Sequence, residues 1–306
     1  MKKKPAVPYL ISSISALHRL LELAPPEHPL ISVINFEEIK CFSEQELRTV
    51  SYDFYCIALK RNFDGKMIYG QHTYDFDEGV MTFFSPGQVI TTDINKGNRL
   101  TGWWLVLHQD YLRHHPLAAT IKSYDYFSYA ANEALYLSPG EENMIETVMK
   151  NIRQEYISVT DHFSQSVILS HVELLLNYCY RFYSRQFITR TPGSHDILVK
   201  LEAILESSFS KEQLALHGIP TVRFVSEQLN MSPNYLSDLL RSFTGNNTQT
   251  HIHNKLIDKA KDALSNTSLS ISEIAYQLGF DYPQSFNKLF KKKMKLSPME
   301  YRHSLN

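Results

Sequence analysis

The last ninety or so residues contain the feature that most constrains the fold, a helix-turn-helix pattern that occurs twice. In the first copy the segment TVRFVSEQL has apolar residues at helical spacing, and the pair Asn230-Met231 marks a turn. A second helix, expected over 233–243, opens at Ser232-Pro233, because serine is a preferred N-cap and proline is tolerated at the first helical position. The pattern predicts two short helices joined by a tight turn.

The second copy follows about fifty residues later. Ser270 with Glu273 forms a capping-box pattern, and Gly279 permits a sharp turn. Pro283 then opens a helix that is expected over 283–292. Its inner stripe is Phe286, Leu289, Phe290 and the aliphatic stem of Lys293.

A single connecting helix, expected at about 248–264, joins the two copies. A rigid helix can hold two recognition helices roughly 34 Å apart, which is one turn of B-DNA, so that both enter major grooves on one face. One such unit is also found in ordinary helical bundles. Two units in tandem favour nucleic-acid recognition, because packing alone does not require the duplication.

The charge is unevenly distributed along the chain, although the formal net charge is only −1. Residues 220–306 carry eleven Lys/Arg against seven Asp/Glu, and the stretch 288–302 carries six basic residues against one acid. A localised basic cluster is typical of a surface that binds phosphates. A solvated helix face is the alternative interpretation of a lysine run.

Candidate DNA contacts follow from the face opposite the apolar stripe of each second helix. In the second unit Gln284, Ser285 and Lys288 are expected to contact bases, because Gln can pair with adenine and Lys can reach guanine. Lys291 and Lys292 are expected to contact phosphates.

The first helix-turn-helix unit is predicted to attract DNA phosphates less strongly than the second. Asp238 repels phosphates, although it can accept a hydrogen bond from cytosine N4, and the alternative is that it only pairs with Arg241. The full candidate set is Asn234, Tyr235, Ser237, Asp238, Arg241, Gln284, Ser285, Asn287, Lys288, Lys291 and Lys292.

The first 137 or so residues have the pattern of short strands. Phe63-Asp64-Gly65 between YDFYCIALKRN and KMIYGQ predicts a hairpin, and Ser85-Pro86-Gly87 predicts a turn between GVMTFF and QVITTDI. LTGWWLVLH adds a further strand. Regularly spaced strands of this kind favour a small sandwich or barrel.

Helices are predicted after Ser138, which opens the first of them. The next, Asp161–Tyr183, carries apolar residues on more than one stripe and must be buried on more than one side. We expect it to pack on its own domain and on a second copy of the chain. Burial within a single subunit is the alternative.

Secretion and membrane insertion are not favoured by the sequence. The three cysteines are far apart, which fits a reducing cytoplasm, and no apolar run approaches the roughly 18 residues of a membrane helix. At the start Leu10, Ile14, Leu17 and Leu21 recur at helical spacing, which favours a packed amphipathic helix over a signal peptide.

From about Thr221 to Arg302 the chain resembles the DNA-binding domain of the AraC/XylS (arabinose-regulator) transcription factors. The resemblance rests on LNMSPNYLSDLLRSFTG, IHNKLIDKAKDALSNTSLSISEIAYQLGF and SFNKLFKKKMKLSPMEYR. Gln284 and Lys295 depart from the Ser and Gly that the family usually has, which implies an altered groove face and a different helix end. The resemblance also implies an N-terminal cupin-like domain that senses an effector and dimerises.

A small-molecule effector is expected inside the β-rich domain, where aromatic residues are available to line a pocket or to form plain core. These residues are Phe54, Tyr69, Tyr74, Trp103 and Trp104. A cupin-type metalloenzyme is a weaker alternative, since His72 stands alone and His108, His114 and His115 lack the spacing of a closed metal site. A scaffold protein whose basic helices bind an acidic partner is the third hypothesis.

The sequence therefore predicts an α+β chain, with a cupin-like β barrel or sandwich followed by helices and then an all-α domain of two helix-turn-helix units. Residues 1–190 are expected to be regulatory and 191–306 to bind DNA. Expected partners are double-stranded DNA, a small effector and a second copy, with RNA polymerase as a further candidate. No enzyme activity, cofactor, metal or membrane contact is predicted.

Overall fold

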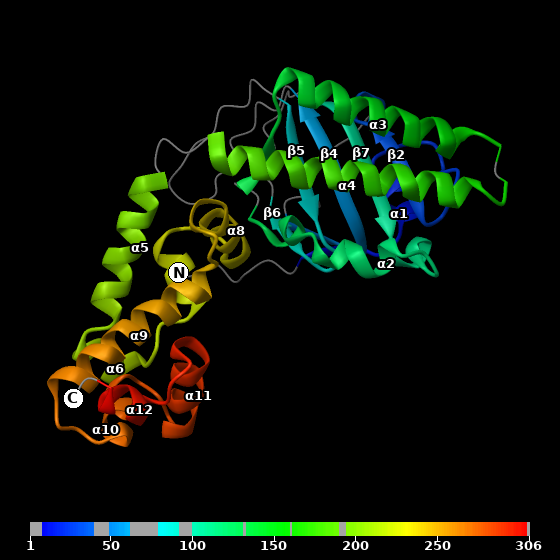
Figure 1. Cartoon of the computed structure of the whole chain (residues 1–306). Helices are drawn as coiled ribbons and strands as arrows, with labels where there is room; N and C mark the ends of the chain where they lie inside the picture. Colours follow the sequence, from blue (N-terminus) through cyan, green and yellow to red (C-terminus); the bar gives the residue numbers. More distant parts are fainter. Residues whose placement is uncertain are drawn as a thin grey trace, which may run out of the picture. The chain divides into compact units, whose positions relative to one another are not determined.

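The computed structural model describes residues 8–39, 49–61, 79–91, 100–130, 133–159, 161–189 and 194–304. The chain forms two compact units, Met1–Thr189 and Arg190–Asn306. Figure 1 shows strands covered by long helices in the first unit and only helices in the second. Among the described residues, no helix is both long and apolar enough to span a lipid bilayer.

The N-terminal unit contains two β-sheets. The larger has the order β2-β7-β4-β5-β8, and all of its neighbouring strands are antiparallel. Its strands are β2 Ile31–Asn35, β4 Phe54–Arg61, β5 Val80–Phe84, β7 Thr101–His108 and β8 Leu135–Tyr136. The smaller sheet has the order β1-β3-β6, with β1 Tyr9–Ile11, β3 Thr49–Tyr52 and β6 Val89–Thr91.

Two antiparallel helices, α3 Pro139–Ile157 and α4 Ser164–Thr189, cover one face of the larger sheet (Figure 1). On this face Tyr183 of α4 contacts Phe83, with ring centroids 6.1 Å apart. Gln186 accepts a hydrogen bond from the Tyr136 amide and donates one to the Ala134 carbonyl, so α4 is fixed to the edge strand β8.

The opposite face of the larger sheet forms a second apolar core. It packs against the smaller sheet and against α1 Ile14–Leu20, with Phe54, Val106 and Leu17 almost completely buried. Short elements complete the unit: η1 Phe36–Glu38, η2 Gln109–Leu112, α2 Leu117–Thr120, η3 Ile121–Ser123 and η4 Asp125–Ser128. The predicted α+β class with a β-rich first half is confirmed.

One sequence-based prediction in this unit is wrong in detail. The amphipathic helix predicted from Leu10 begins only at Ile14, because Ser13 is its N-cap and its side chain accepts from the Ala16 amide. Leu10 instead lies in β1, where it pairs with Ser51 and is exposed.

Two turns were predicted among the strands. The one at Ser85-Pro86-Gly87 is confirmed, since the Gln88 amide donates to the Ser85 carbonyl and Gly87 has a φ of 79°. The hairpin at Phe63-Asp64-Gly65 lies outside the described residues.

The C-terminal unit consists of helices around one apolar core that includes Leu236, Leu256, Ile274 and Phe286. The helix α5 is held to α9 by ion pairs from Lys255 to Glu202 and Glu206. The helices are α5 Ser194–Ser208, α6 Lys211–His217, α7 Val222–Gln228, α8 Pro233–Thr244, α9 Thr248–Asn266, α10 Ile271–Gln277, α11 Pro283–Met294 and α12 Pro298–His303.

Candidate nucleic-acid interface

The turns of the two helix-turn-helix units have the same backbone hydrogen bonds. In the first, the Met231 amide donates to the Ser226 carbonyl, and Asn230 has a left-handed φ of 54°. In the second, the Phe280 amide donates to the Ala275 carbonyl, and Gly279 has a φ of 82°. Each first helix therefore ends in a Schellman-type cap that turns the chain sharply into the next helix.

The second helices, α8 and α11, are of equal length but begin differently. Both have proline in the first turn, and the Ser232 side chain caps α8 by accepting from the Tyr235 amide. The N-cap of α11 is Tyr282, whose side chain makes no capping bond.

Their C-terminal ends are equivalent. Gly245 after α8 and Lys295 after α11 are both left-handed, so Lys295 occupies the position at which glycine is favoured.

The connecting helix α9 contacts both helix-turn-helix units and the last helix, α12. Near its start the buried Thr248 hydroxyl bonds to the Ser237 hydroxyl of α8 at 3.0 Å. Farther along, Asn254 accepts a hydrogen bond from Lys293 of α11. Near its end, Arg302 of α12 donates to the Leu264 carbonyl. A helix of 19 residues spans about 28 Å, so α9 holds the two helix-turn-helix units at a defined separation from each other.

The outer face of α11 is the more basic of the two candidate faces. Phe286 and Phe290 are completely buried on the inner side, as predicted. The opposite side carries only exposed residues, namely Gln284, Ser285, Asn287, Lys288, Lys291 and Lys292. The structure therefore brings all six predicted residues of this unit onto one accessible surface.

The outer face of α8 carries little net charge, because Asp238 and Arg241 form an ion pair. The Arg241 side chain is 50% exposed and that of Asp238 14%, so the guanidinium reaches solvent while the carboxylate lies against the helix surface. Asn234 is exposed and Tyr235 is half-buried.

Ser237 requires a correction among the predicted DNA contacts. It was expected on the outer face, but it is half-buried and its hydroxyl bonds to Thr248. Its role here is to connect α8 to α9. The helical wheel could not show this, because the partner comes from the following helix.

Tyr282 was missed by the sequence interpretation. It is 68% exposed and lies directly before α11, at the end of the helix where Gln284 and Ser285 are also exposed. An exposed aromatic residue before a proline-initiated helix was a signal that could have identified it.

Of the five predicted effector residues, the three that the structure describes do not share one site. Phe54 and Trp104 are buried in one core, where Trp104 stacks on Phe36 at 5.9 Å. Trp103 points to the other side of β7, as alternation along a strand requires, and lies 5.5 Å from the Arg153 guanidinium. The prediction that Trp103 and Trp104 line one pocket is therefore wrong. Tyr69 and Tyr74 lie outside the described residues.

Two of the histidines considered as metal ligands, His108 and His115, make local backbone contacts. His108 Nδ1 accepts from the Asp110 amide, and His115 Nδ1 accepts from the Leu117 amide. His72 is not among the described residues. Within the described ranges, no group of three or more His, Cys, Asp or Glu residues is arranged to hold a metal ion.

Comparison with known proteins finds a matching family model, curated relatives and similar solved structures. A family model described as a helix-turn-helix domain matches residues 225–304. The regulatory protein PocR of Salmonella typhimurium is 27% identical over 123 residues, which cover 39% of this chain and 37% of PocR. The transcriptional activator RhaS of Escherichia coli is 30% identical over 109 residues, which cover 33% of this chain and 39% of RhaS.

A solved structure is also similar in sequence. The C-terminal domain of the two-component response regulator yesN from Fusobacterium nucleatum is 32% identical, with 33% of this chain and 93% of that domain covered and a TM-score of 0.29. The chain spans less than half of the length of either curated relative.

The paired turns, the shared connecting helix and the family match define the C-terminal unit as a helix-turn-helix domain. The C-terminal unit is a helix-turn-helix domain of the AraC/XylS type of transcriptional regulator. This confirms the resemblance drawn from the motifs between Thr221 and Arg302.

Proposed function

We propose that this protein regulates transcription by inserting α8 and α11 into successive major grooves of duplex DNA. The observation that carries this proposal is the accessible outer face of α11, with its amide, hydroxyl and lysine side chains, on a helix fixed to α9. Lysines on such a face neutralise phosphates, and Gln284 and Ser285 near the helix start are the proposed contacts to base edges.

The scaffold hypothesis makes a different prediction for the same surface. If α11 binds an acidic protein, replacing Gln284 does not alter any preference among DNA sequences. If α11 reads bases, Gln284→Ala relaxes the preference at one base position by about 1–3 kcal/mol.

The experiment compares the affinities of the full-length chain for a set of duplexes by fluorescence anisotropy. Gln284→Ala is expected to change the ranking of the duplexes, whereas Lys291→Ala weakens all of them about equally. Lys211→Ala is the matched control, because Lys211 is exposed on α6 and outside both candidate faces. An unchanged ranking for Gln284→Ala together with unchanged affinity for Lys291→Ala would exclude this function.

We also propose that the chain forms a homodimer through α4. Val167 and Leu174 are 37% and 41% exposed on this helix. The half-buried His171 and Tyr178 lie at helical spacing on the same stripe. A second copy that presents the same stripe would remove these apolar groups from water. Leu174→Glu should give monomers in sedimentation velocity at micromolar concentration, whereas Ser184→Glu on a different side of α4 should not. A wild-type chain that sediments as a monomer would contradict the dimer.

The N-terminal unit is the proposed sensor of a small effector, and RNA polymerase is a candidate partner of the DNA-bound protein. These assignments, with 1–190 as regulatory and 191–306 as DNA-binding, are supported by the order of the two units and by family membership.

A further inference from the structure

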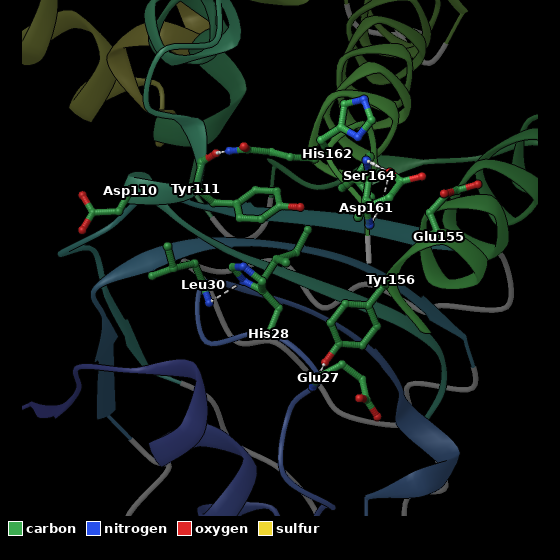
Figure 2. A pocket seen from close by; sticks show the side chains of 13 residues that line it. Glu27, His28, Leu30, Asp110, Tyr111, Glu155, Tyr156, Asp161, His162 and Ser164 are labelled. Atoms are coloured by element: carbon green, nitrogen blue, oxygen red, sulfur yellow. Dashed lines mark hydrogen bonds between the residues drawn. The ribbon is translucent and has the colours of Figure 1, made fainter. Parts of the chain in front are cut away.

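The N-terminal unit contains a pocket of about 400 Å³ beside the turn from α3 to α4 (Figure 2). Its walls come from the segment before β2, from η2, from the end of α3 and from the start of α4. Pockets of roughly 300–1,000 Å³ are the usual size for small-molecule sites. Of the predicted effector residues, the three that the structure describes, Phe54, Trp103 and Trp104, do not line this pocket.

Tyr111 brings a hydroxyl group to the pocket, on a side chain that is otherwise largely buried. The residue is 5% exposed, and its ring packs edge-on against His28 with centroids 5.0 Å apart. Its hydroxyl has no hydrogen-bond partner among the described residues, and Figure 2 shows it directed into the pocket toward Asp161. Burial raises the pKa of Tyr111 to about 12, so the phenol stays neutral. The hydroxyl is not among the buried atoms that lack a partner, so it is accessible from the pocket and can bond to water or to a ligand.

His28 is neutral in this environment, because burial lowers its pKa. Its Nδ1 accepts a hydrogen bond from the Leu30 amide at 3.1 Å, so the neutral ring carries its proton on Nε2. The histidine therefore does not add a positive charge that would oppose a cation.

Acidic side chains outnumber basic ones in the lining, in which His162 lies next to Asp161. Four of the thirteen are Asp or Glu, and none is Lys or Arg. Asp110 pairs with Arg113 at 2.7 Å, and Asp161 caps the start of α4 through Oδ1. Glu27 and Glu155 form no ion pair within the described part of the chain, so their negative charges are not neutralised there.

We propose that this pocket binds a small organic cation, such as a primary amine or a guanidinium on a short carbon chain. An ammonium group has only donors, and the pocket offers acceptors, among them the Glu155 carboxylate and the Tyr111 hydroxyl oxygen. The rings of Tyr111 and Tyr156 supply apolar surface and favourable faces for a cation. An anionic ligand would be repelled by the same carboxylates. This inference is independent of the DNA-binding proposal.

The test is isothermal titration calorimetry of the full-length chain with three four-carbon probes. These are 1,4-diaminobutane, the uncharged 1,4-butanediol and the anionic succinate, at equal ionic strength. The diamine is expected to bind, whereas the diol and succinate give no heat of binding. Binding of the diol or of succinate as tight as that of the diamine would overturn the proposal.

Two variants identify the site. Glu155→Gln should weaken diamine binding by about tenfold or more, and Tyr111→Phe, which removes only the hydroxyl, by about threefold to tenfold. Glu37→Gln is the matched control, because Glu37 is an exposed acid outside the pocket. If both variants bind the diamine as the wild type does, the diamine binds outside this pocket and the proposed site is refuted. This outcome does not depend on whether the protein binds DNA.

Discussion

At the scale of single residues, the equivalent positions 230 and 279 in the two helix-turn-helix turns differ in which side chains they can accommodate. Asn230 and Gly279 both have positive φ, which asparagine tolerates at modest cost. Gly279 also meets a steric limit, because a Cβ there would lie 3.2 Å from the Ile219 amide nitrogen and 3.3 Å from Gly218. Glycine at 279 is therefore needed for backbone conformation and for close approach together.

Replacement of this glycine should destabilise the C-terminal unit. Gly279→Ala is expected to lower the free energy of unfolding by roughly 1–3 kcal/mol, measured by urea denaturation. Asn230→Gly is the matched control, and its effect should stay within about 1 kcal/mol of zero. An equal decrease in the free energy of unfolding in both variants would show that the close approach of residue 279 to Ile219 does not contribute to stability.

A second residue-scale prediction concerns Glu146 of α3, which accepts hydrogen bonds from Arg61 of β4. This contact, together with the ion pair to Lys150, lowers the pKa of Glu146 from 4.5 to about 2. Because the folded-state pKa lies below the unfolded value, the contact stabilises the fold above about pH 4.5, and this stabilisation is lost as the pH falls toward 2. With screening at a side chain that is 20% exposed, it contributes roughly 2 kcal/mol.

Urea denaturation at pH 6 and pH 3.5 measures this contribution. The wild type should lose more stability between the two pH values than Glu146→Gln, which cannot titrate at this position. Glu37→Gln should behave as the wild type does, since Glu37 is an exposed acid. An identical pH dependence in wild type and Glu146→Gln would exclude the proposed contribution of this ion pair.

At the scale of elements, α8 and α11 have similar geometry but opposite charge at one equivalent position. Asp238 of α8 corresponds to Lys288 of α11, when the helices are aligned from Pro233 and Pro283. In α8 the acid pairs with the basic residue one turn later, whereas α11 carries lysines at 288, 291, 292 and 293. The phosphate attraction should therefore come mainly from α11.

This asymmetry is measurable as a salt dependence. Replacing Lys291 and Lys292 together with glutamine should reduce the slope of log K against log salt by about two, while Arg241→Gln should reduce it by less than one. The difference arises because Asp238 already neutralises Arg241. Equal slopes for the two variants, determined by anisotropy between low and moderate salt, would contradict the asymmetry.

The helices of the C-terminal unit were predictable because their signals are local. Ser232, Ser270 and Pro283 begin helices where their capping chemistry predicts them. Ser237 and Leu10 were misplaced for a shared reason. Ser237 bonds to Thr248 of the next helix, and Leu10 pairs with strand β3. Neither partner lies in the segment from which the helix was predicted.

At the scale of the whole molecule, family and fold class could be predicted, but the sites of the N-terminal unit could not. The β-rich half followed from turns and alternating residues, whereas the acidic pocket joins His28, Tyr111 and Glu155 from distant parts of the chain. Such a pocket depends on sheet register and on the placement of α3 and α4 (Figure 1). Aromatic content indicated core residues, and Phe54 and Trp104 are examples of this.

The central claim is that two recognition helices on one connecting helix bind DNA together. Selection of bound sequences from a random duplex library, followed by footprinting with the full-length chain, tests it most directly. The account predicts a site with two conserved segments about 10–10.5 base pairs apart, centre to centre, both protected on one face of the duplex. A single short segment, segments on opposite faces, or no enrichment above the starting library would contradict it.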